Sequence, residues 1–230
     1  MRYLDKDVAH LLHGSPYLTL AKPRGAVRLL QREVEIGERW VATLRQFPAV
    51  RVEPLEFHYR CLRNLGALDP TFFEMLVGDH GWRGVVWGSF LAMLEPRARF
   101  LGPLQRELGR WPINDWIVEH AVATLEGRAP REHEDVVALV ARLREVLHGV
   151  PRPAIPLRCA PTAAQMEQMR HEQEHIRTVY AEEGTDAALA AIPGTLMGYY
   201  VQDYLRWARA GAAPPPRGWT GLVSLSLEDT

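Results

Sequence analysis

Residues 168–180, QMRHEQEHIRTVY, hold the residue types and spacing of one catalytic motif. His171, Glu172 and His175 match the pattern H-E-x-x-H. On a helix, histidines four residues apart lie on one face and can share a zinc ion, while the glutamate between them activates a bound water. The motif therefore predicts one alternative function, a zinc-dependent hydrolase with His171 and His175 as metal ligands and Glu172 as the catalytic base.

The surroundings of this motif favour a structural interpretation. Glu174 places a charge at a middle position where catalytic zinc helices usually carry uncharged residues, and no histidine follows His175 to serve as a third ligand. At helical spacing the two histidines point away from an apolar stripe, which indicates a solvated face with charge pairs three and four residues apart. The stripe expected to face the core consists of Met166, Met169, Gln173, Ile176 and Tyr180.

The two cysteines, Cys61 and Cys159, are too few for a disulfide framework and lack the C-x-x-C spacing of metal or redox sites. His58 and Cys61 share one helix face, but the sequence indicates no acidic partner for them. We therefore expect both side chains to be packed in the core, and we expect no cofactor unless the zinc alternative holds.

Tryptophan and arginine residues are concentrated in the middle of the chain. Both types are over-represented at the energetic centres of protein interfaces, so we expect a partner-binding surface here. Its candidate residues are Trp82, Arg83, Arg97, Arg99, Arg106, Arg110 and Trp111. A second, acidic group consists of Glu132, Glu134 and Asp135, whose carboxylates could mimic phosphates toward a basic partner.

The elements that must position these residues are helices. Apolar residues recur at helical period along most of the chain, and prolines and glycines separate the segments after a few residues. Asp69 followed by Pro70 is a strong helix start. We expect an all-α protein with helices over residues 23–46, 55–65, 72–77, 82–94, 100–108, 113–125, 135–147, 162–182, 185–192 and 195–209.

A weak repeat relates three of these helices, because similar endings at Leu65, Leu94 and Leu125 are 29 and 31 residues apart. Short joints make neighbouring helices antiparallel, so the chain is predicted to form stacked helical hairpins, either a short HEAT-like array or an irregular bundle. The expected organisation is a helical-repeat domain at 1–150, a Pro-rich linker at 151–161, C-terminal helices at 162–210 packed on the array, and a tail at 211–230, with a lone strand at 222–227.

Composition limits the functional classes. Of the 230 residues, 47% are hydrophobic and 24% charged, with a formal net charge of −1, so the chain has no overall electrostatic bias toward nucleic acid or anionic lipid. The N-terminal residues lack the basic and apolar regions of a signal peptide, and no segment is apolar over the length of a membrane span. We expect a cytoplasmic protein that binds neither nucleic acid nor membrane.

Residues 81–108, GWRGVVWGSFLAMLEPRARFLGPLQREL, and the Pro-rich exit near residue 153 resemble bacterial HEAT-like helical-repeat proteins. The resemblance covers residues 62–153 and depends on Trp82, Arg83 and the helix-ending Leu94 and Leu125. Some of these proteins are immunity proteins of polymorphic toxins. The resemblance implies a cytoplasmic bacterial protein that neutralises a toxin or effector by direct binding, without chemistry of its own.

These observations lead to one preferred function and two alternatives. The preferred function is a non-enzymatic protein-binding module, an immunity protein or inhibitor. One alternative is the zinc hydrolase that uses His171, Glu172 and His175. The other is an accessory subunit of a partner enzyme, which would also have an interaction surface and no active site.

Overall fold

The computed structural model describes residues 1–130 and 132–216, and within these ranges the chain is helical and contains no β-strand. The all-α prediction is confirmed. None of the described helices combines the length and apolar character needed to cross a membrane. The strand expected at 222–227 lies outside the described residues. The chain divides into two compact units, Met1–Ala160 and Pro161–Thr230.

The first unit is built from α-helices joined by short turns. They are α1 (Asp5–Leu12), α2 (Tyr17–Leu20), α3 (Pro23–Gln46), α4 (Glu56–Gly66), α5 (Pro70–Asp79), α6 (Gly81–Leu94), α7 (Leu101–Glu107), α8 (Asp115–Leu125) and α9 (Glu134–Leu147). The short 3₁₀ turns η1 (Ala98–Phe100) and η2 (Pro112–Asn114) precede α7 and α8.

Local sequence signals explain where several of these helices begin. The Asp69 side chain accepts a hydrogen bond from the Phe72 backbone N–H over 2.8 Å, so the predicted cap of α5 is present. Pro23 is the first residue of α3, where its missing N–H costs no helical hydrogen bond. The sequence patterns missed α1 and α2, whose 8 and 4 residues are too short to show a clear period.

Helix α6 lies at the centre of the first unit. Its residues 84–94 are all buried, and it contacts α2, α4, α5, α7, α8 and α9. Glycine permits the closest of these approaches, because a Cβ at Gly84 would lie 1.9 Å from the Leu76 backbone oxygen of α5. A helix that is apolar all round is expected to be buried on every side, as α6 is.

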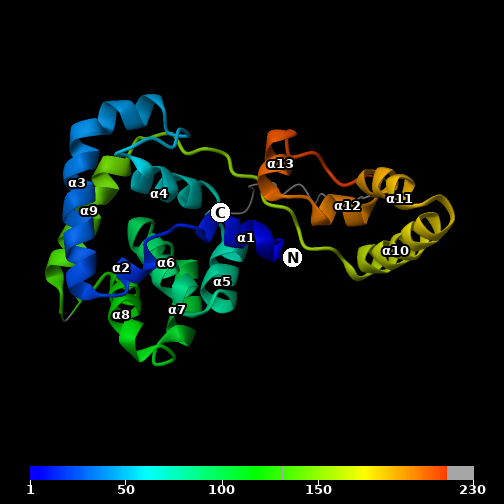
Figure 1. Cartoon of the computed structure of the whole chain (residues 1–230). Helices are drawn as coiled ribbons and strands as arrows, with labels where there is room; N and C mark the ends of the chain where they lie inside the picture. Colours follow the sequence, from blue (N-terminus) through cyan, green and yellow to red (C-terminus); the bar gives the residue numbers. More distant parts are fainter. Residues whose placement is uncertain (131, 217–230) are drawn as a thin grey trace. The chain divides into compact units, whose positions relative to one another are not determined.

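The longest helix of this unit, α3, packs along α9, which is more than eighty residues later in the chain. Figure 1 shows these two helices side by side, α3 in blue and α9 in yellow-green. In an ideal solenoid each repeat contacts only its neighbours, whereas a central helix with distant partners is typical of a bundle. The arrangement therefore matches the bundle form of the fold prediction, and the HEAT-like resemblance stays a prediction.

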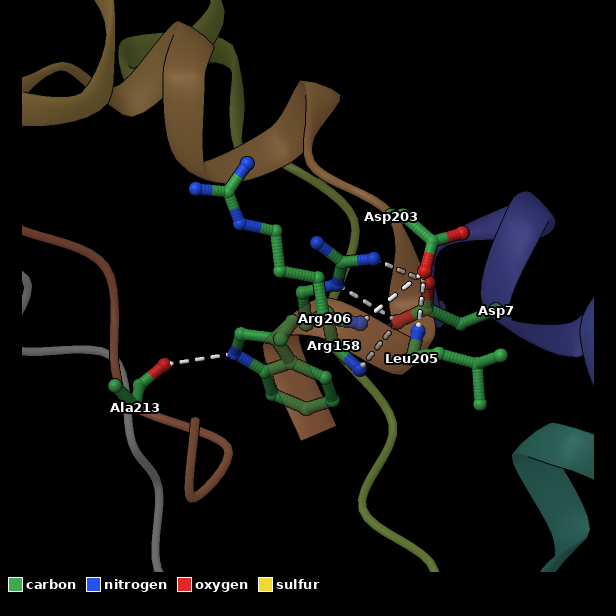
Figure 2. Close-up of polar contacts among 7 residues, drawn as sticks. Asp7, Arg158, Asp203, Leu205, Arg206 and Ala213 are labelled. Atoms are coloured by element: carbon green, nitrogen blue, oxygen red, sulfur yellow. Dashed lines mark hydrogen bonds and ion pairs between the residues drawn. The ribbon is translucent and has the colours of Figure 1, made fainter. Parts of the chain in front are cut away.

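The Pro-rich segment through Ala160 belongs to the first unit. Its Arg158 side chain is buried and donates to the Asp7 carboxylate of α1, from Nε over 2.9 Å and from Nη2 over 2.6 Å. Figure 2 shows this two-point contact between Asp7 and Arg158. An isolated antiparallel bridge also joins Tyr3 to Cys159. The segment expected as a linker is thus tied to α1 through Arg158, and to residues 2–4 before α1 through residues 158–160.

The described part of the second unit contains α10 (Ala163–Glu183), α11 (Thr185–Ala191), the 3₁₀ turn η3 (Ile192–Gly194), α12 (Leu196–Val201) and α13 (Tyr204–Arg209). Helix α10 packs against α11 and α12. The single helix expected at 195–209 is divided at Gln202, because Asp203 caps a new helix by accepting from the Leu205 and Arg206 N–H groups (Figure 2). The packing of residues 162–210 on the array stays a prediction.

Candidate functional site

An apolar hollow on the first unit brings together two of the predicted partner-binding residues, Trp82 and Trp111. Its volume is about 310 Å³, near the lower end of the range for ligand pockets. The lining comes from α2 and the residues after it, from the start of α6, and from η2. The lining residues are Leu18, Ala21, Lys22, Trp82, Trp111, Pro112, Ile113 and Asn114.

Trp82 is held by aromatic and cationic contacts at the start of α6. The Tyr17 ring of α2 meets it edge-on, with centroids 5.7 Å apart and planes at 84°. The Arg83 guanidinium lies 5.3 Å from the Trp82 centroid and 5.6 Å from that of Tyr17, which is within cation–π range for both rings. These contacts fix the indole as one wall of the hollow.

Trp111 is held in place by the buried carboxylate of Glu107. Its indole N–H donates to Glu107 Oε2 over 3.2 Å, and Arg110 donates to the other oxygen of the same carboxylate over 2.7 Å. Glu107 is buried at the end of α7. The Asn114 N–H also donates to the Trp111 carbonyl over 2.7 Å, which closes the η2 turn. Trp111 therefore forms a positioned second wall.

The remaining wall is formed by α2 and the residues after it. The Trp116 indole N–H donates to the carbonyl of Ala21, the C-cap of α2, over 2.9 Å. At the rim, Leu18 is 64% exposed and Ile113 is 85% exposed. Single exposed apolar residues are common on soluble proteins, whereas a group of them around a hollow is typical of interaction surfaces. The arrangement can accept a bulky apolar group, and the lining residues form no constellation for covalent chemistry.

None of the predicted arginines lines this hollow, although Arg83 contacts Trp82. Arg97 donates to the Leu68 carbonyl over 2.8 Å and pairs with Glu95, so it ties the end of α6 to the turn before α5. Arg106 pairs with Glu74 over 2.9 Å beside a different, polar hollow that Arg110 also lines. Arg99 is exposed within η1. Trp82, Arg83 and Trp111 are thus the predicted residues that lie together.

The predicted acidic group lies at the start of α9. Glu132, Glu134 and Asp135 are exposed, and Asp135 also accepts a hydrogen bond from the Val136 N–H over 3.0 Å. Acidic residues in the first turn suit the positive end of the helix dipole, so their position has a structural explanation. Glu134 lines a third hollow, so the acidic residues and the tryptophans do not line the same one.

In the H-E-x-x-H segment, His171 and His175 are exposed on α10, as the sequence predicts. Glu172 lies on the inner side, where its carboxylate accepts from the Met197 N–H at the start of α12 over 3.1 Å. Arg170 and His171 both pair with Glu167, at the predicted spacings of three and four residues. Over residues 1–130 and 132–216, no group of three or more His, Cys, Asp or Glu side chains is arranged to hold a metal ion.

The apolar stripe of α10 is placed one residue away from its prediction. Met169 and Ile176 are partly buried as expected, but Met166, Gln173 and Tyr180 are exposed. The inner face of the helix includes Gln165, Met169, Glu172, Ile176 and Val179. The expectation was wrong at these positions because it assumed an apolar inner face. The inner face instead includes Gln165, whose side chain caps the helix, and Glu172, whose carboxylate accepts from α12.

A second polar cluster, outside the hollow, joins α3 to α4. His58 and Cys61 are fully buried, as predicted, but a buried acid that the sequence did not indicate, Glu33, lies beside them. His58 Nε2 is 2.9 Å from the Glu33 backbone oxygen, and His58 Nδ1 is 3.8 Å from Glu33 Oε2. These last two atoms have no hydrogen-bond partner among the described residues.

Burial determines the protonation of this cluster. It lowers the pKa of His58 to about 4 and raises the pKa of Glu33, although the ion pair with Arg32 opposes the latter shift. Burial likewise raises the pKa of the Cys61 thiol. His58 and Cys61 are therefore neutral near pH 7. A protonated thiol is a poor nucleophile, so the cluster is a packing feature between two helices.

The sequence patterns missed Leu18, Lys22 and Ile113, which complete the hollow. Leu18 belongs to a helix of 4 residues, too short to show a period, and Ile113 belongs to the 3-residue turn η2 that precedes α8. The sequence predicted Ile113 as the first residue of a helix over 113–125, and its only other signal was an apolar run with Trp111 and Pro112. Such a run does not show that its side chains are exposed.

No family model matches the chain, and the searches of curated proteins and of solved structures found no significant match.

Proposed function

We propose that this chain is a non-enzymatic protein-binding module that binds another protein through the apolar hollow of Trp82 and Trp111. The observation that supports the proposal is the exposure of Ile113 and Leu18 around two positioned indole rings. Water contact with these side chains is unfavourable, and covering them with a partner would release about 25 cal/mol for each Å² of apolar surface buried. The tryptophans are of the residue type that most often anchors such contacts.

Neutralisation of a toxin or effector domain is the particular form of this function that the helical-repeat resemblance implies. A binder of that kind needs a firm scaffold and an exposed contact surface, and it needs no catalytic group. The buried α6 supplies a scaffold of this kind beneath the hollow. Inhibition of a bacterial toxin therefore remains part of the proposal.

The test is affinity purification of the tagged chain from its native host, beside the variant Ile113→Asp. The variant places a charge on the rim without disturbing the core, because the Ile113 side chain is 85% exposed. We expect a protein that is retained by the wild type and lost from the variant, and whose activity falls when the wild-type chain is added. The exposed Val50→Asp, outside the hollow, is the matched control and should retain the partner.

Other results would favour the alternatives. A recovered enzyme that needs this chain for its activity would identify an accessory subunit and would contradict the inhibitor role. Stoichiometric zinc in the purified protein, lost on His175→Ala, would support the zinc hydrolase and defeat the non-enzymatic proposal. A retained protein set that is identical for the wild type and Ile113→Asp would exclude the hollow as the contact surface.

A further inference from the structure

We infer that the hollow of Trp82 and Trp111 recognises an acidic segment of a partner protein, in which Asp or Glu residues flank one bulky apolar side chain. This inference depends on the proposed protein-binding function and adds the chemistry of the partner. It follows from two positive charges at the hollow, Lys22 in its lining and Arg83 over one of its walls.

Lys22 is the only charged residue among those that line the hollow. It is exposed, and none of the described carboxylates forms an ion pair with it. Elsewhere on the same unit, Arg106 pairs with Glu74 and Arg142 pairs with Glu38. The ammonium group of Lys22 is therefore available to a carboxylate that a partner supplies.

Arg83 adds a second positive charge. Its guanidinium lies over Trp82, which lines the hollow, and over Tyr17, and it forms no ion pair with a carboxylate of the described residues. Arginine stacked on an aromatic ring keeps its N–H groups at the edge of the plane, where they can donate to a carboxylate. An acidic side chain of the partner could thus contact Arg83 while its neighbour entered the hollow.

The start of α3 strengthens the positive potential at the same place. Lys22 is its N-cap, Arg24 follows in the first turn, and that turn contains no acidic residue. The first N–H groups of a helix carry partial positive charge, so stability favours Asp or Glu at these positions. Two basic residues there oppose the local preference of the helix, which is expected where a surface binds anionic groups.

The hollow itself sets the remaining requirement. Its volume of about 310 Å³ is enclosed mainly by apolar side chains, so it would take one or two large apolar groups and leave charged groups at the rim. Asp115 is the nearest acid in sequence to the lining, directly after Asn114, and its Oδ1 already accepts from the Gly109 N–H over 3.1 Å. A basic segment would find no free carboxylate among the lining residues, whereas an acidic segment would find Lys22 and Arg83.

A selection experiment tests this inference with the full chain. Random 12-residue peptides displayed on phage are selected on the immobilised protein, and enriched peptides are synthesised and titrated against the wild type and three variants. Ile113→Asp tests occupation of the hollow and Lys22→Glu tests the charge. Arg39→Glu is the matched charge control, because it lies on the same helix 17 residues later, or about 25 Å away.

We expect the enriched peptides to carry Asp or Glu on both sides of a Trp, Phe or Leu. We expect Ile113→Asp to abolish their binding, Lys22→Glu to weaken it about 5- to 10-fold, and Arg39→Glu to leave it unchanged. The dependence of affinity on salt should become shallower in Lys22→Glu. Circular dichroism of each variant checks folding, and Leu18→Asp serves as a second rim variant if Ile113→Asp is unfolded.

Two outcomes would overturn the inference and are distinguishable. Peptides that lose binding in Ile113→Asp but lack acidic residues, or that bind Lys22→Glu as well as the wild type, would defeat the acidic partner and leave the proposed binding surface intact. An absence of enriched peptides, or enriched peptides that bind equally to Ile113→Asp and Leu18→Asp, would defeat both proposals.

Discussion

At the scale of single residues, the buried carboxylate of Glu107 determines where Trp111 lies. One oxygen accepts from the indole N–H and the other from Arg110, so a single side chain of α7 orients both residues. A buried carboxylate with two donors is stable where an unpaired one would not be. The aromatic wall of the hollow therefore depends on a residue that does not line the hollow itself.

Replacing Glu107 with alanine should destabilise the protein and weaken partner binding together. Trp111 would lose the acceptor of its N–H, and we expect the free energy of unfolding to fall by about 1–2 kcal/mol. Urea denaturation measures this change. The control is Glu74→Ala, which removes an exposed pair with Arg106 and should cost less than about 0.5 kcal/mol. Equal losses in the two variants would show that Glu107 has no special structural role.

The pair of His58 and Glu33 predicts a dependence of stability on pH. Because burial holds the pKa of His58 at about 4, below its usual value of 6.5, the unfolded chain binds this proton more readily between those values. The stability that neutral His58 contributes is present above pH 6.5 and is lost as the pH falls toward 4, by up to about 3 kcal/mol. The contribution of Glu33 to stability changes with pH in the opposite direction. Because its pKa is raised in the folded state, its contribution is present at low pH and is lost as the pH rises through that pKa.

The variant His58→Gln isolates the histidine contribution, because a glutamine amide can still donate to the Glu33 carbonyl. We expect the difference in unfolding free energy between wild type and variant to shrink as the pH falls from about 6.5 to about 4. Urea denaturation at a series of pH values measures it. Glu33→Gln provides the control for the opposing titration. Parallel pH curves for wild type and His58→Gln would contradict the assigned protonation.

At the scale of elements, the pair of Asp7 and Arg158 attaches the Pro-rich segment to α1. Both side chains are buried, and the guanidinium meets the carboxylate through two donors. We expect Asp7→Ala to destabilise the protein by about 3 kcal/mol, since removing one member of a buried pair leaves the other without this partner. The exposed Asp5→Ala on the same helix is the control for urea denaturation. A loss below about 1 kcal/mol in Asp7→Ala would show that the segment is held by other contacts.

The start of α10 is stabilised by a capping box. The Thr162 hydroxyl accepts from the Gln165 N–H over 3.2 Å, and the Gln165 side chain accepts from the Thr162 N–H over 2.9 Å. Thr162→Ala should lower stability by about 1 kcal/mol. Thermal unfolding followed by circular dichroism measures the change. Thr178→Ala in the interior of the same helix should be neutral or slightly stabilising, because alanine is the better helix former there.

At the scale of the whole molecule, the apolar core is unevenly distributed between the two units. The large cluster of buried residues extends from Val8 to Val150 and lies entirely in the first unit. The buried apolar side chains of the second unit within residues 161–216 are few, namely Ala188, Leu196, Tyr199, Tyr200, Tyr204 and Trp207. A larger buried core supports independent folding, whereas a small one leaves a unit marginal.

We therefore expect a chain that ends after Ala160 to fold without the second unit. It retains the core cluster and the pair of Asp7 and Arg158, so it should give a helical circular dichroism spectrum and one cooperative thermal transition. It should also keep the peptide binding assigned to the hollow, whose lining lies within residues 18–114. Broad, non-cooperative unfolding of this fragment would contradict the prediction.

The sequence by itself determined the elements of this protein. Apolar period and turn residues located α3 to α11 within a few residues, and Asp69 marked the start of α5 because capping is a local interaction between residues three apart. Spacing also placed the two imidazoles of the H-E-x-x-H segment on the exposed side of α10. These properties depend on neighbours in the chain, which a sequence displays directly.

Only the tertiary structure decided which residues meet. Trp82 and Trp111 line one hollow with Leu18 and Lys22, whereas Arg97 and Glu134, equally good candidates by type, lie elsewhere. Glu33 meets His58 across 25 residues, and Asp7 meets Arg158 across 151. Contacts of this kind depend on how helix faces pack, and many different packings satisfy the same local periodicity. The exposure of a side chain also depends on this packing. Ile113 therefore could not be recognised from the sequence as a residue at the rim of the proposed binding surface.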